Sequence, residues 1–83
     1  MIYDFKGIKT KKFLLNNFLV FLSSVKDNCY WEYYGMKVEI DPTIDFENNN
    51  ILIRWYNVDE GFNDKIIYYN LADFKKDFTL INA

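Results

Sequence analysis

The spacing of the apolar residues changes within this chain, and that change most constrains the fold. Between Thr10 and Lys26 apolar residues recur every three or four positions, which is typical of an amphipathic helix. They are Phe13, Leu14, Phe18, Phe21, Leu22 and Val25. In residues 36–41 apolar and charged residues alternate, which is typical of a strand with one buried face. The sequence therefore predicts a long helix followed by a sheet.

Local signals place the ends of these elements. Thr10 is a suitable N-cap, and residues 27–28, Asp-Asn, are expected to end the helix. We expect residues 29–34 to belong to the same strand as residues 36–41, with Gly35 as a bulge or bend. Pro42 has no N–H to donate, so it either ends this strand or marks a sheet edge.

Further strands and a second helix complete the predicted layout. Residues 51–58 and 65–70 have strand character, residues 44–47 extend the preceding strand, and turns at 48–50 and 59–64 separate the strands. Asn70 can cap a helix whose third residue is Asp73. That helix would carry Leu71, Phe74, Phe78 and Ile81 on one face.

The predicted fold is one α+β domain over residues 1–83. A three-stranded antiparallel sheet packs on one long N-terminal helix and is followed by a short C-terminal helix, in the order α-β-β-β-α. Residues 2–5 are a candidate for a short fourth strand.

Alternation sorts the side chains of the strands into two faces. The face towards the long helix is expected to hold Met36, Val38, Ile40, Ile51, Ile53, Trp55, Ile66 and Tyr68. The opposite face is expected to hold Lys37, Glu39, Leu52, Arg54, Tyr56, Lys65, Ile67 and Tyr69. Trp31 and Tyr33 join this opposite face if the alternation continues through Gly35.

The chain contains 17 aromatic residues among 83, and adjacent rings such as Trp55-Tyr56 put one ring on each face of a sheet. A chain of this length builds one core, which buries one face. The other face is covered by the C-terminal helix or by a second copy, or it is an exposed partner site. Because aromatic residues and Arg are enriched at interfaces, the candidate partner-binding residues are Trp31, Tyr33, Arg54, Tyr56 and Tyr69.

Acidic residues concentrate in the middle of the chain. Residues 38–64 contain seven carboxylates and one arginine, a net charge of −6. Such a block attracts cationic partners and repels phosphate. Asp45, Glu47, Asp59 and Glu60, on two expected turns, are therefore further candidate partner-binding residues.

Residue types that most catalysis needs are missing. There is no His, so Cys29, the one cysteine, has no imidazole to activate it. The three glycines are isolated, which excludes a glycine-rich phosphate loop. Asp45 and Glu47 resemble an acid/base couple, but they flank an expected exposed turn where no cleft would shift a pKa. The acidic residues do not follow the calcium-loop pattern, so we predict no enzyme activity, no cofactor and no metal site.

The sequence also predicts a soluble cytoplasmic protein. Residues 13–25 are too short and too often interrupted by polar residues to span a membrane. The N-terminus lacks the layout of a signal peptide, and a single cysteine suits a reducing compartment.

In size, acidity, Asn/Lys-rich composition and α-β-β-β-α layout, the chain resembles small phage-encoded inhibitors of the anti-CRISPR type. The resemblance covers the whole chain, contains no shared motif and implies a protein-binding inhibitor. A basic nucleic-acid-binding protein is the expected partner, because the acidic block would compete for its groove. Immunity proteins that neutralise toxins fit equally well, and a homodimer is a further expectation.

A single-stranded nucleic-acid-binding module is the alternative. Bases would stack on Tyr33, Tyr56 and Tyr69, as on other aromatic sheet platforms. The acidic block argues against direct nucleic-acid binding, because phosphate contacts supply most nonspecific affinity.

Overall fold

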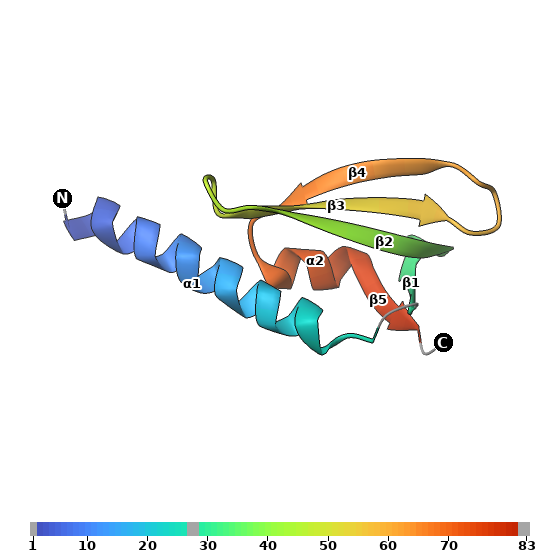
Figure 1. Ribbon diagram of the computed structural model, residues 1–83, viewed down its shortest axis with the longest axis horizontal. Helices are drawn as coiled ribbons and strands as arrows, with labels where there is room; N and C mark the ends of the chain where they lie inside the picture. The colour runs from blue at the N-terminus through green and yellow to red at the C-terminus, as the bar shows by residue number, and fades with distance from the viewer. Residues whose placement is uncertain (1, 27–28, 82–83) are drawn as a thin grey trace.

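The structure is a computed structural model that describes residues 2–26 and 29–81, with side chains from residue 11 onward (Figure 1). Its elements are α1 (Ile2–Ser24), β1 (Tyr30–Tyr33), β2 (Met36–Asp45), β3 (Asn50–Asn57), β4 (Asn63–Tyr68), α2 (Leu71–Asp77) and β5 (Phe78–Ile81). The strands form one antiparallel sheet in the order β4-β3-β2-β1-β5.

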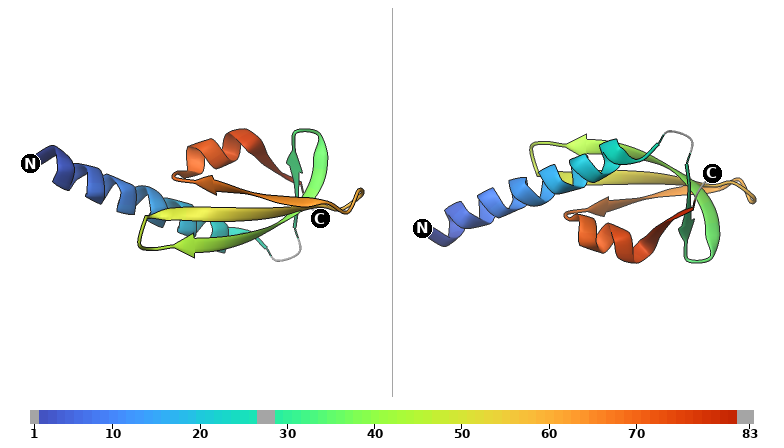
Figure 2. Two further views of the ribbon diagram at one scale, coloured as in Figure 1. Left: turned by 90° about the horizontal axis from the view of Figure 1, so that it is seen from above. Right: turned by 90° about the horizontal axis from the view of Figure 1, so that it is seen from below.

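Both helices lie on the same side of the sheet (Figures 1 and 2). Phe18 of α1 contacts Phe74 of α2, with ring centroids 5.2 Å apart. The core that they share with the sheet consists of Leu15, Phe18, Trp31, Val38, Ile51, Ile53, Trp55, Tyr68, Phe74 and Phe78. We call this covered side the inner face and the opposite side the outer face. The α+β class, the long N-terminal helix, the antiparallel sheet and the short C-terminal helix are confirmed.

A tight turn at Tyr34 and Gly35 replaces the predicted bulge. Both residues have positive φ, 47° and 80°, as in a two-residue hairpin turn. Tyr33 therefore pairs with Met36, and residues 30–33 form a separate strand, β1. A tyrosine in the left-handed region costs energy, and the Tyr34 hydroxyl is held in place by Asp77 at 2.7 Å.

The first helix begins at Ile2, so the predictions of an N-cap at Thr10 and of a strand at residues 2–5 are wrong. Apolar residues before Thr10 continue a helical spacing, and cap preference is a weak signal against that pattern. The helix ends at Ser24, and the hydroxyls of Ser23 and Ser24 donate to the carbonyl oxygens of Val20 and Phe21. The predicted stop at residues 27–28 lies outside the described residues.

The last part of the chain changes from helix to strand. Asn70 caps α2 as predicted, because its side-chain oxygen accepts from the Asp73 N–H at 2.8 Å. The helix ends at Asp77, however, and residues 78–81 form β5 beside β1 instead of continuing the helical face. Phe78 stays buried and stacks on Phe74, with centroids 4.8 Å apart. The sheet thus has five strands where the sequence predicted three.

Pro42 lies inside β2, opposite Ile53 of β3. The pairing of β1 with β2 runs only from Trp31↔Val38 to Tyr33↔Met36, so β2 is an edge at Pro42. The missing N–H removes no bond to β1 there, and the edge alternative is confirmed.

Candidate functional site

The strand register confirms the predicted membership of the outer face. Glu39, Tyr56 and Asn63 form one row across β2, β3 and β4. The next rows are Asp41, Arg54 and Lys65, and then Thr43, Leu52 and Ile67. Lys37 lies on the same face of β2, and Tyr69 follows the end of β4.

Neither helix covers this face. The side chains of Tyr56, Ile67 and Tyr69 are 43%, 53% and 56% exposed. The alternative in which the C-terminal helix covers the outer face is therefore wrong, because α2 packs on the inner face through Phe74. Cover by a second copy of the chain and an exposed partner site are the two alternatives that stay open.

Trp31 and Tyr33 do not belong to the outer face. Trp31 is 2% exposed and contacts Phe74, with centroids 5.2 Å apart. Tyr33 lies between Trp55 and Phe78, at 5.0 Å and 4.6 Å. The tight turn pairs Trp31 with Val38, and directly opposed residues share a face. These two predicted partner-binding residues are part of the core and its border.

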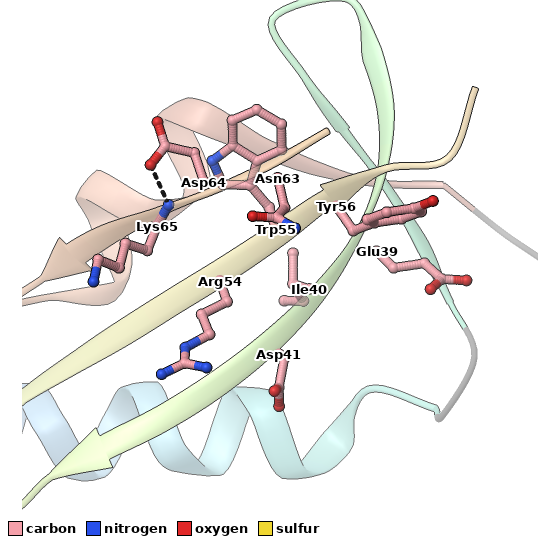
Figure 3. Close-up of a pocket in the computed structure, with 9 residues that line it drawn as sticks. All are labelled: Glu39, Ile40, Asp41, Arg54, Trp55, Tyr56, Asn63, Asp64 and Lys65. Carbon is pink, nitrogen blue, oxygen red and sulfur yellow. Dashed lines mark hydrogen bonds between the residues drawn. The ribbon is translucent and has the colours of Figure 1, made fainter. Parts of the chain in front are cut away.

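A hollow of about 550 Å³ lies among the rows of the sheet (Figure 3). It is lined by Glu39, Ile40, Asp41, Arg54, Trp55, Tyr56, Asn63, Asp64 and Lys65. In Figure 3 the side chains of Arg54 and Lys65 extend towards one end of the sheet, and those of Tyr56 and Glu39 extend towards the other. Arg54 and Lys65 thus point away from Tyr56 and Glu39, whereas Asp41 lies in the same row as the two cations.

The charges of the outer face are not neutralised by one another. Arg54 stands opposite Asp41 on one side and Lys65 on the other, yet among the described side chains the one ion pair within 4.0 Å is Lys76–Asp73. Like charges on directly opposed residues destabilise a sheet.

The acidic candidates fall into two separate groups. Asp45 and Glu47 are at the β2–β3 turn, whereas Asp59 and Glu60 are at the β3–β4 turn. The hairpin between these turns runs from Asp45↔Asn50 to Val38↔Asn57, seven residue steps or about 23 Å. The structure therefore does not bring the four carboxylates together.

The Asp45 carboxylate has a structural role in its turn. Its oxygens accept from the Asn48 side-chain amide at 2.8 Å and from the N–H groups of Asn48 and Glu47 at 3.1 Å. The Asn48 side chain first, and then these N–H groups, lower the pKa of Asp45. A carboxylate whose pKa is lowered in this way is a poor acid/base group near neutral pH.

The turn that carries Asp59 and Glu60 adjoins the outer face. Asn57 holds it by accepting from both N–H groups, at 2.9 Å and 2.8 Å. Gly61 has a φ of 79°, and a Cβ placed there would be 3.6 Å from the Tyr56 hydroxyl. The turn that carries Asp59 and Glu60 therefore lies next to the Tyr56 hydroxyl.

Sequence reasoning missed a cluster around Asp77. Tyr34 and Tyr68 donate hydroxyl hydrogen bonds to its two oxygens, at 2.7 Å and 2.6 Å. Burial of Tyr68, and then its bond to Asp77, raise the pKa of that tyrosine. No spacing in the sequence links these residues. The cluster ties the β1–β2 turn and β4 to the end of α2, which makes it a structural feature.

Within residues 2–26 and 29–81, no helix is long and apolar enough to cross a membrane. In the same part of the chain, no three His, Cys, Asp or Glu side chains are grouped as they would be around a metal ion. Comparisons with protein-family models, with curated proteins and with solved structures gave no match.

Proposed function

We propose that this chain is a small, non-catalytic inhibitor that binds another protein through its outer face and the adjoining acidic turn. One observation carries the proposal: the outer face is uncovered by either helix and exposes Tyr56, Ile67 and Tyr69. Exposed aromatic and aliphatic side chains on one face are typical of interaction sites. Here they lie towards both ends of the face, because Tyr56 pairs with Asn63, whereas Ile67 and Tyr69 are four and six residues further along the chain.

The charges support a partner with a basic surface. The turn with Asp59 and Glu60 adjoins this face, and Glu39 and Asp41 lie on it. Complementary charge speeds association and selects among partners. A nucleic-acid-binding groove is such a surface, and this inhibitor would compete with nucleic acid for it.

The small size and acidity of the chain support the anti-CRISPR type of phage-encoded inhibitor as the specific class, and the single cysteine supports action in the cytoplasm. A toxin-neutralising immunity protein would use the same kind of surface. The two differ in the partner and not in the binding chemistry.

The test is affinity capture with the tagged full chain from its host, or from the phage-infected host, followed by mass spectrometry. The affinity for the captured protein is then measured with Ile67→Ala, Tyr69→Ala and the control Phe13→Ala. Phe13 is 64% exposed but lies on α1. We expect the outer-face variants to weaken binding by about 2 kcal/mol and the control to leave it unchanged. The reverse pattern would refute the proposal.

Single-stranded nucleic-acid binding is the second candidate, because Arg54 and Lys65 lie in the row beside Tyr56. The charge of the outer face is unfavourable for nucleic-acid binding, since Glu39 and Asp41 lie on the same face. We expect no appreciable binding of mixed-sequence oligonucleotides in fluorescence anisotropy at physiological salt. Micromolar affinity that falls steeply with added salt would favour this second candidate.

A further inference from the structure

We propose that the outer face recognises a basic segment of the protein partner and seats an arginine side chain on the ring of Tyr56. The guanidinium would lie between Glu39 and the turn that carries Asp59 and Glu60. This inference rests on the proposed function, because it names the chemistry that the same face recognises.

The surroundings of Tyr56 fit a guanidinium group. Tyr56 is 43% exposed, and Glu39 is the residue directly opposite on β2. On the other side, the hydroxyl end of the ring reaches Gly61 in the acidic turn. A guanidinium stacks on an aromatic face and donates paired hydrogen bonds to carboxylates, whereas an ammonium makes only point contacts.

No cation of the described chain occupies this seat. Lys37, the nearest basic residue along β2, places its Nζ 4.2 Å from the centre of the Tyr30 ring. Arg54 and Lys65 are one row away, about 7 Å along the strands. Figure 3 shows that their side chains extend away from Tyr56 and Glu39. The acidic-aromatic end of the hollow is therefore open to a cation from outside.

The experiment is an NMR titration of the full ¹⁵N-labelled chain with a hexapeptide of three Arg-Gly repeats. A hexapeptide of three Lys-Gly repeats has the same charge and serves as the matched probe. We expect the largest amide shifts at Glu39, Tyr56 and Gly61, and at least about fivefold tighter binding of the arginine peptide. Equal binding of the two peptides, or the largest shifts at Asp45 and Glu47, would overturn the inference.

Variants test whether binding depends on the Tyr56 ring and Glu39, or only on general charge attraction. Tyr56→Ala should weaken binding of the arginine peptide by about fivefold and abolish the preference over lysine, whereas Tyr69→Ala should do neither. Glu39→Gln, which keeps the shape of the side chain, should weaken binding more than Glu47→Gln on the remote turn. Equal losses of affinity within each matched pair of variants would refute the proposed arginine site at Tyr56.

Two further outcomes are distinguishable. Outer-face shifts that change on dilution without peptide would show that a second copy occupies the face, which overturns the inference. If the arginine peptide does not bind at Tyr56 but the captured partner still needs Ile67 and Tyr69, the inference fails and the proposed function stands. If the captured partner needs neither residue, the proposed function itself fails.

Discussion

Asp77 accepts two tyrosine hydroxyls of very different burial, which predicts unequal contributions to the free energy of unfolding. Tyr68, 4% exposed, donates at 2.6 Å, and Tyr34, 72% exposed, donates at 2.7 Å. A hydrogen bond to a charged group contributes about 1.5–3 kcal/mol, and less where water competes for the groups. We expect Tyr68→Phe to lower the free energy of unfolding by about 2 kcal/mol and Tyr34→Phe to lower it clearly less.

Thermal and urea unfolding of the purified variants measure this difference. For a domain of this size, a loss of 2 kcal/mol lowers Tm by roughly 10 °C. Tyr69→Phe is the matched control, because Tyr69 is adjacent, 56% exposed, and makes no side-chain hydrogen bond among the described residues. Its effect should stay within about 0.5 kcal/mol. If Tyr68→Phe were as harmless as Tyr69→Phe, the reasoning would be wrong.

A double-mutant cycle tests whether the loss comes from the bond itself. Asp77→Asn keeps the shape of the acceptor and removes its charge. In that background Tyr68→Phe should cost less than in the parent protein, with a coupling of about 1 kcal/mol. Additive effects would show that the Tyr68 hydroxyl acts through other contacts.

Three further outcomes are expected. Burial, and then the bond to Asp77, hold the pKa of Tyr68 above its ordinary value near 10. The stabilisation that the Tyr68 hydroxyl gives to the fold is therefore complete below pH 10 and is lost as the pH rises further. The free energy of unfolding should therefore fall more steeply above pH 10 in the parent than in Tyr68→Phe, and parallel curves would contradict this. Millimolar calcium, magnesium or EDTA should leave Tm nearly unchanged, since a ligand at a hundredfold its Kd would add about 2.7 kcal/mol; a clear rise with one cation would refute the prediction of no metal site. In thermal melts Tyr56→Ala and Tyr69→Ala should cost under about 1 kcal/mol and Phe74→Ala, fully buried, about 3–5 kcal/mol; a large loss at either tyrosine would mean that its ring is covered.

Strand alternation predicted the part of the site that depends on local pattern alone. Glu39, Arg54, Tyr56 and Ile67 share the outer face because β2, β3 and β4 are long, regular and paired in register. The cap at Asn70 was equally local, since one side chain and one N–H make it. Features that a few neighbouring residues determine could therefore be predicted from the sequence.

Features that depend on contacts between residues far apart in the sequence could not be predicted from it. Tyr-Gly is a weaker turn signal than Asn-Gly, and the Tyr34 hydroxyl supports this turn by donating to Asp77, 43 residues away. Phe74, Phe78 and Ile81 have helical spacing, but the open edge of β1 accepts residues 78–81 as a strand. At the turn and at residues 78–81 alike, tertiary contacts outweighed the local sequence pattern.

The two additional strands also explain why the outer face is uncovered. A three-stranded sheet is about 10 Å between its outer strands, which one helix of about 10–12 Å diameter covers, and a second helix is then free to pack on the other side. Five strands span about 19 Å, so two helices are needed to cover one face. Here α1 and α2 both pack on the inner face, and Phe18 and Phe74 meet between them. Because neither helix packs on the outer face, Tyr56, Ile67 and Tyr69 stay exposed. The hairpin at Tyr34 and the strand at residues 78–81 thus create the surface on which the proposed function depends.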